Sequence, residues 1–480
     1  MLSAAFCWAA CGEDAKPSIL KIGPRIARTV VCRRSGGQAA IKTNEESDMR
    51  IETKTSKIHA EKHHLAPMLS NAAKAGFLTS FFLAAGVGHA EQLETPGNRM
   101  ATEILSGELL TGPNYRVGET VVSYGYMDHW AVDSDFGAFE VTGDGALRSL
   151  IREIYAIAAL KEISKTEAFA GAVAEAAKQP FQLAGKMLTD PVDTVTALPK
   201  GVFRIFGNIG TGLTEKSDPS EDSGIEKALA VSSWKREFAA QYGVNVYSSN
   251  KVLQEELNRI GWASAIGGLG VSAALIPFSG PAVLVFKTTS LSNKVIEALA
   301  TEPPSRLRII NAEKLSAMGV SEELAQKFLD HPSLTPRHDS IIVAALADLK
   351  DASGREVFIE AAIWAEDEVS ANFFTDVAQM IHGYDETVSP IEDISLVNGI
   401  VIARANNGRA LIPFALDHGV WTKRASQVIM GMKKTYESSG FSGKYDFWVT
   451  GTVSSLARQQ LDSQGIEVAE NMRGQLGLLD

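Results

Sequence analysis

Residues 75–87 form an uncharged apolar stretch that decides how much of the chain is left to fold as a domain. Lys74 stands just before this stretch, and small residues occupy the third and first positions before a cut between Ala90 and Glu91. A basic start, a short apolar stretch and small residues at the cut are typical of a secretory signal peptide, and the stretch is short for a bilayer span. We therefore predict a signal peptide over 68–90, cleaved between Ala90 and Glu91.

The predicted signal lies late in the chain, and the simplest explanation is that translation starts at Met68. Residues 1–67 are then an upstream extension, which we expect to be disordered because no apolar period is sustained in it. A lipoprotein signal ending at Cys11 is an alternative, but it has no basic residue before its apolar stretch. A second alternative is a mitochondrial-type presequence over 16–43, which is supported only by the presence of Arg and Lys in a stretch without acidic residues. The remaining alternative is that the apolar stretch is a buried core helix ended by a glycine.

Cleavage after Ala90 would remove every cysteine, since Cys7, Cys11 and Cys32 are the three in the chain. A mature chain of residues 91–480 could then hold no disulfide, thiolate zinc site or cysteine nucleophile.

The net charge of the whole chain is −11, and residues 91–480 carry 34 basic and 50 acidic side chains, a net charge of −16. An acidic chain without a basic stripe repels nucleic acid at long range, so we expect no nucleic-acid partner.

The chain is predicted to fold in the α+β class. Residues 91–145 begin with a polar leader and continue into a β-rich patch. Trp130, Val132, Phe139 and Val141 alternate on either side of a turn at Ser134-Asp135-Phe136-Gly137, which predicts a β-hairpin. The Asp-Phe-Gly triplet in that turn has no kinase context around it, so we interpret it as turn chemistry only.

Residues 146–300 are predicted to form a helical, glycine-rich middle domain. Apolar residues recur at helical spacing from Leu147 to Ala158, and Asp144 is placed to cap that helix. Asn250 is placed to cap a later helix.

The stretches SSWKREFAAQYG and KVLQEELNRIGW lie in the same middle domain. Together they span most of 228–262, a segment that resembles one found in uncharacterised exported bacterial proteins. The resemblance is consistent with export and implies no known chemistry.

Residues 263–286 form a second uncharged segment, long enough to span a bilayer but interrupted by four glycines, three serines and two prolines. Three interpretations remain open: buried core helices, a membrane-inserting or peripheral hairpin, and a true membrane span. If the segment is exposed, it is where a membrane or protein partner would bind.

Residues 301–480 are predicted to form an α/β domain. Asn406-Asn407-Gly408 marks the turn of a hairpin, and KYDFWVTG, VSSLARQQLDSQG and IEVAEN read as a terminal βαβ unit with a parallel strand pair. The remaining segments read as helices over 312–330, 340–350, 356–382 and 421–438.

The sequence holds no strong catalytic motif. Residues 91–480 show no HExxH pair, no G-x-S-x-G elbow and no phosphate loop. The weak candidates are Asp417 and His418, directly after a predicted strand, and Thr450, directly after the next one, because ligands favour the carboxyl ends of strands in α/β sheets. We predict no cofactor and no metal ligands.

These observations favour an exported protein of the envelope or periplasm, or a secreted one, that is non-enzymatic and acts by binding or by envelope association. The alternative is a soluble exported hydrolase with its site in the C-terminal α/β domain. The sequence does not decide between an enzyme and a binding protein, and it does not indicate an oligomeric state.

Overall fold

The computed structural model describes residues 92–123, 126–177, 219–269 and 289–479, with side chains in the third range from residue 229, and three short strands nearer the start of the chain. The predicted signal peptide, its cleavage site and most of 263–286 lie outside these residues. The chain divides into two compact units, Met1–Gly88 and His89–Asp480.

In the first unit the three strands form an antiparallel sheet in the order β1-β2-β3. They are β1 (Lys16–Ile19), β2 (Val30–Arg34) and β3 (Gly37–Ile41). All three lie within residues 1–67.

The second unit begins with an antiparallel sheet in the order β4-β7-β8-β6-β5, with β9 paired to β8. Ser134 pairs with Gly137 at the tip of the β8–β9 hairpin, so the hairpin predicted there is confirmed. The elements of this layer are β4 (Arg99–Met100), α2 (Ala101–Ile104), α3 (Gly107–Leu110), β5 (Thr111–Gly112), β6 (Tyr115–Val117), β7 (Thr120–Ser123), β8 (Asp128–Ser134) and β9 (Gly137–Thr142).

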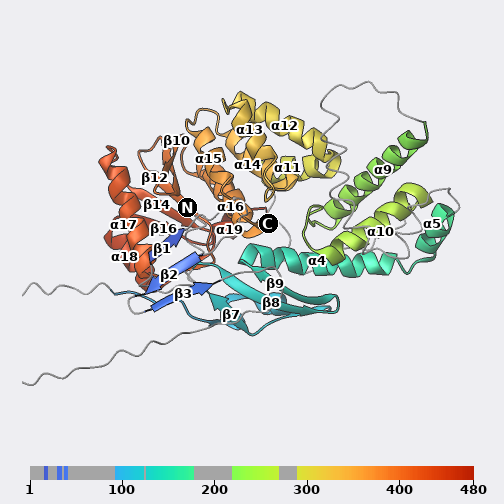
Figure 1. The fold of residues 1–480 in the computed structure, drawn as a ribbon, viewed down its shortest axis with the longest axis horizontal. Coiled ribbons are helices and arrows are strands. Elements are labelled where there is room, and N and C mark those ends of the chain that lie inside the picture. The colour runs from blue at the N-terminus through green and yellow to red at the C-terminus, as the bar shows by residue number, and fades with distance from the viewer. Residues whose placement is uncertain are drawn as a thin grey trace, which may run out of the picture. The chain divides into compact units, whose positions relative to one another are not determined.

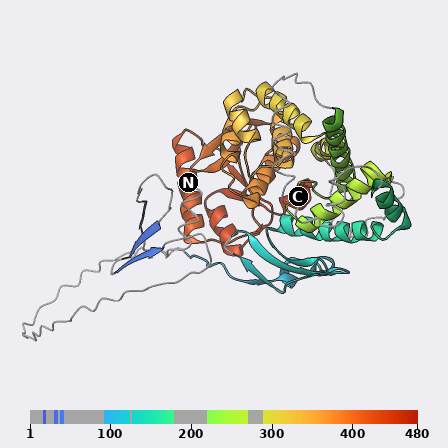
Figure 2. The same cartoon turned by 45° about the vertical axis from the view of Figure 1, so that its right-hand side comes forward.

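Helix α4 (Asp144–Ile163) connects this sheet to the helical middle, which adds α5 (Glu167–Ala177), α9 (Pro219–Gln241) and α10 (Lys251–Gly267). The first turns of α4 pack into the core of the sheet, and its later turns pack with α5, α9 and α10. One helix therefore belongs to two hydrophobic cores. The view in Figure 2 shows α4 running from the strands toward the green helices.

The C-terminal part is a mixed five-stranded sheet, in the order β10-β11-β12-β14-β16, with helices on both faces (Figure 1). Strands β10, β11 and β12 are antiparallel neighbours, whereas β12, β14 and β16 run parallel. The predicted hairpin and the terminal βαβ unit are confirmed. The five strands are β10 (Ile391–Val397), β11 (Ile400–Ala405), β12 (Ala410–Phe414), β14 (Tyr445–Val449) and β16 (Ile466–Ala469). Two further strands, β13 (His418–Gly419) and β15 (Thr452–Val453), form a separate parallel pair.

Helices α15, α16 and α19 pack on one face of this sheet, and α11 to α14 add to the same hydrophobic core by packing on other helices. Helices α17 and α18 pack on the other face. Together with the strands above, these elements give the α+β class that the sequence predicted. The helices are α11 (Ser290–Thr301), α12 (Pro304–Ala317), α13 (Glu322–Leu329), α14 (Pro336–Asp348), α15 (Arg355–Ala362), α16 (Glu368–Thr387), α17 (Lys423–Ser438), α18 (Ser455–Ser463) and α19 (Met472–Leu476).

Two of the predicted long helices are wrong, because each is divided in the structure. The segment predicted as 356–382 breaks before α16, where the Asp367 carboxylate accepts a hydrogen bond from the Ser370 amide at 2.8 Å. Such a cap starts a new helix with its own direction. The segment 312–330 is likewise split between α12 and α13, with Ser321 as the second cap.

Of the uncharged segment 263–286, only its first seven residues are described. Ala263 and Leu269 are buried in the helical core. A Cβ added to Gly267 would lie 2.1 Å from the carbonyl oxygen of Ala172, so this end of α10 packs directly on α5. Among the described residues, no helix combines the length and the apolar character that crossing a bilayer requires.

Glu153 on α4 is buried at the junction with α10. Its Oε2 accepts a hydrogen bond from Asn250 Nδ2 at 3.0 Å, and Asn250 in turn caps α10, as predicted. Burial raises the pKa of Glu153 from 4.5 to about 7, against the lowering effect of hydrogen bonds from Ser248 and Asn250. The carboxyl group is therefore favoured in its protonated form at the helix junction.

We expect Glu153→Gln to stabilise the protein at pH 8 and to change little at pH 4.5. An acid whose pKa rises on folding contributes stability below its unfolded pKa, and that contribution is lost as the pH rises through about 7. The loss amounts to about 3 kcal/mol, which a neutral glutamine avoids. Urea unfolding at both pH values measures it, with the exposed Glu237→Gln as control. An equal effect of Glu153→Gln at the two pH values would contradict this account.

Candidate functional site

Three aspartates from distant parts of the chain meet at the carboxyl ends of the parallel strands. Asp128 begins β8, Asp144 is the first residue of α4, and Asp417 follows β12. One carboxylate oxygen from each lies within 4.8 Å of those from the other two. We call these three residues the aspartate cluster.

Asp417 joins the C-terminal sheet to the N-terminal layer through backbone hydrogen bonds. Its Oδ2 accepts from the Asp128 amide and its Oδ1 accepts from the Asp144 amide, each at 2.9 Å. The Asp144 amide belongs to the first turn of α4, where helix amides lack intrahelical partners. Asp417 therefore completes the start of a helix that lies 273 residues earlier in the chain.

Asp144 does not cap its own helix as the sequence predicted. The cap position is Gly143, without a side-chain hydrogen bond, and α4 begins one residue later. The Asp144 carboxylate instead lies beside those of Asp128 and Asp417. Its Oδ1 and the Oδ1 of Asp128 are both buried and accept no hydrogen bond within the described part of the chain.

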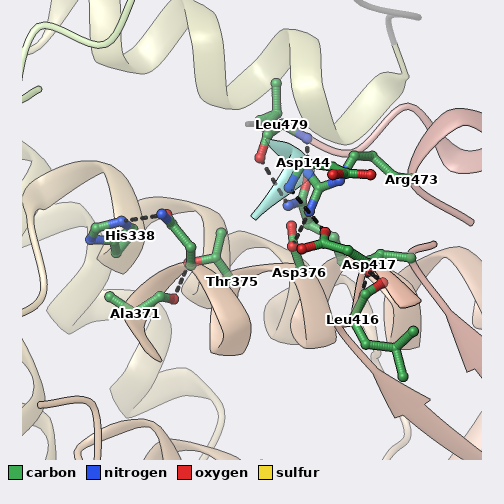
Figure 3. Close-up of polar contacts among 12 residues, drawn as sticks. Asp144, His338, Ala371, Thr375, Asp376, Leu416, Asp417, Arg473 and Leu479 are labelled. Atoms are coloured by element: carbon green, nitrogen blue, oxygen red, sulfur yellow. Dashed lines mark hydrogen bonds and ion pairs between the residues drawn. The ribbon is translucent and has the colours of Figure 1, made fainter. Parts of the chain in front are cut away.

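Arginines lie close to the cluster, and one of them pairs directly with a cluster member. Arg99 forms an ion pair with Oδ2 of Asp128, and Arg473 forms one with Asp376 of α16. Figure 3 shows Asp144, Asp417 and the Arg473–Asp376 pair gathered at one place. A Cβ at position 145 would lie 2.7 Å from the Arg473 guanidinium, so glycine there lets Arg473 cross close to the start of α4.

The pKa of Asp417 is raised, mainly by burial and next by the charge of Asp144, although the two backbone hydrogen bonds lower it. The pKa of Asp144 is also raised by burial and by Asp128, against the lowering influence of Arg473, Arg148 and Arg99. Neighbouring carboxylates in a buried site resist being charged at the same time unless something neutralises them.

Thr450, a predicted site residue, has a structural role between β12 and β14. Its hydroxyl donates to the Leu416 carbonyl at 2.7 Å and accepts from the Leu416 amide at 2.8 Å. At the next residue, Gly451, an added Cβ would lie 2.1 Å from the Asp417 carbonyl oxygen. The close approach of these two loops therefore needs glycine.

His418, the third predicted residue, is adjacent to Asp417 but makes a different contact. Its Nδ1 lies 2.9 Å from the Thr452 hydroxyl, and its backbone belongs to the short parallel pair β13–β15. Burial lowers the pKa of His418, and the nearby Arg99 lowers it further. Among the described residues, no hydrogen bond joins the Asp417 carboxylate to this imidazole, so the two do not form a catalytic dyad.

Of the three aspartates in the cluster, the sequence had indicated Asp417 as a candidate site residue and had not related Asp128 or Asp144 to it. Asp128 and Asp144 lie in a hairpin and at a helix start almost 300 residues before Asp417, and no local spacing relates them. What the arrangement offers chemically is hard oxygen donors, which suit Mg²⁺, Ca²⁺ or Mn²⁺ among metals.

Comparisons with protein-family models, with curated proteins and with solved structures found no match to this chain. The resemblance of residues 228–262 to exported bacterial proteins therefore remains a prediction.

We expect Asp417→Asn to lower the free energy of unfolding by about 2–3 kcal/mol. An asparagine oxygen can accept from only one of the two amides, and its NH₂ group would face the other, which leaves a buried donor unpaired. Urea unfolding provides the measurement, and Asp462→Asn on the exposed side of α18 provides the control. Equal stability of the two variants would show that Asp417 does not join the two layers.

Proposed function

We propose that the protein is exported and acts in the periplasm or envelope as a non-enzymatic binding protein. The observation that carries the proposal is the sequence of 68–90, which has the basic start, the apolar stretch and the small residues of a signal peptide. The compact unit that follows begins at His89, one residue before the last residue of that signal. A cut after Ala90 would thus remove almost nothing from the unit.

The first described residues after the predicted cut support the same proposal. Glu94 receives hydrogen bonds through Oε2 from the Trp421 amide at 2.6 Å and from the Ser454 hydroxyl at 2.5 Å, and its own amide donates to the Trp421 carbonyl at 2.8 Å. Ser454 is also the N-cap of α18. A chain starting at Glu91 would keep this anchor, since Glu94 would be its fourth residue.

The contacts of the predicted site residues favour a binding role over the hydrolase hypothesis. The carboxylate of Asp417 and the hydroxyl of Thr450 are both occupied by backbone groups. A general base or nucleophile must lie within reach of a substrate, and both of these side chains are buried. The second element of the proposal is that residues 263–286 bind a partner, either a membrane or another protein.

Mass spectrometry of the protein from its producing cells tests the proposal at its first step. We expect a mature N-terminus at Glu91, recovered from the periplasmic or envelope fraction. We expect Leu83→Arg, which places a charge in the apolar stretch, to leave the chain uncleaved. Leu93→Arg, exposed and beyond the cut, serves as the control and should be processed normally. An intact chain beginning at Met1 in the cytosol would overturn the proposal.

A further inference from the structure

We propose that Asp128, Asp144 and Asp417 bind one hard divalent cation, which bridges the N-terminal layer and the C-terminal sheet. The proposal does not depend on export, and it assigns a ligand class that the sequence did not predict. It rests on three observations about the cluster: the separation of its oxygens, the two oxygens without partners, and the balance of charge.

The separation of the oxygens fits a single ion. Oxygen ligands lie about 2.0–2.6 Å from Mg²⁺ or Ca²⁺, so two ligands of one ion are separated by at most about 5 Å. The three carboxylates each offer an oxygen within 4.8 Å of the others. These separations lie within the range that the ligands of one cation span, and water would complete the coordination.

The unpartnered oxygens point to a missing ligand. Asp128 is fully buried, and Arg99 binds its Oδ2, so Oδ1 is left without a hydrogen bond. The Oδ1 of Asp144 is buried in the same way. Buried carboxylate oxygens in folded proteins are nearly always hydrogen-bonded or bound to metal, because leaving them bare is costly.

The balance of charge also favours a cation. Within the described residues, the ion pairs at this place join Arg99 to Asp128 and Arg473 to Asp376. Asp144 and Asp417 take part in neither pair and contribute two negative charges when both are ionised. Arg473, Arg148 and Arg99 also act on Asp144 electrostatically and offset part of its negative charge. A divalent cation would neutralise the charge of Asp144 and Asp417, which form neither of these two ion pairs.

The bridging role follows from where the three ligands lie. Asp128 and Asp144 hold the two ends of the β8–β9 hairpin, and Asp417 lies at the end of β12 in the other sheet. The cation would thus reinforce the contact that the Asp417 carboxylate makes with the two backbone amides. Its binding should therefore stabilise the whole second unit and not one loop.

The test uses the full chain after removal of metal with a chelating resin, titrated with MnCl₂ at constant ionic strength. Free Mn²⁺ is followed by electron paramagnetic resonance, with MgCl₂ and CaCl₂ as competitors and NaCl as the ionic control. We expect one Mn²⁺ per chain, displaced by Mg²⁺ or Ca²⁺, and a rise of about 2–5 °C in the unfolding midpoint at one hundred times the dissociation constant. Failure of the unmodified chain to bind Mn²⁺ would overturn the proposal.

Asp144→Asn separates ligation from a merely structural role. We expect Mn²⁺ to bind it at least ten-fold more weakly, while the metal-free variant stays as stable as the unmodified chain or becomes more stable, because one of three crowded charges is gone. Asp462→Asn should bind Mn²⁺ normally. Unchanged affinity in Asp144→Asn would refute the site. If that variant does not fold, anomalous scattering from Mn²⁺-soaked crystals of the unmodified chain decides: a peak among the three aspartates supports the proposal, and a peak elsewhere or none overturns it.

Discussion

The carboxylate of Asp417 is the contact on which the arrangement of the second unit depends. It accepts the amides of Asp128 and Asp144, which stand at the two ends of the β8–β9 hairpin. Helix α4 starts at the second of these amides and continues into the helical middle, so this one carboxylate orients the strand layer, α4 and the sheet with respect to one another. A neutral residue at 417 could not accept both bonds as strongly, since hydrogen bonds to a charged acceptor are about twice as strong as neutral ones.

The same carboxylate creates an electrostatic difficulty that the surrounding residues only partly resolve. Asp128 and Asp144 lie within 4.8 Å of it, and all three are largely removed from solvent. Arg99 and Arg473 neutralise part of the negative charge by forming ion pairs with Asp128 and Asp376, respectively. A bound proton or a bound cation must supply the remaining positive charge. A cation would also give the Oδ1 atoms of Asp128 and Asp144 the partner that they lack. The cluster thus connects the stability of the fold with a binding site.

Local features of the chain were predicted well where a short-range cause exists. The turn at 134–137, the hairpin at Asn406-Asn407-Gly408 and the terminal βαβ unit follow from alternation and turn chemistry within a few residues. The helix breaks before Asp367 and around Ser321 were missed, because apolar spacing continues through both places and only the cap geometry divides the helices. Likewise, the position of Asp144 in the sequence predicts a helix cap, whereas in the structure the amide of Asp144 donates a hydrogen bond to the Asp417 carboxylate.

The sequence by itself determined the α+β class, the acidic charge and the chemistry of the 68–90 segment, since each depends on composition or on neighbours along the chain. It also placed Asp417 and His418 just after a predicted strand, and Thr450 at the carboxyl end of the first strand of the predicted parallel pair. Only the tertiary structure decided what these residues do: Thr450 joins two strands, His418 contacts Thr452, and Asp417 meets two aspartates from the other end of the chain. The physical reason is that a carboxylate's role depends on which charges and amides lie within a few ångströms, and those come from segments almost 300 residues apart.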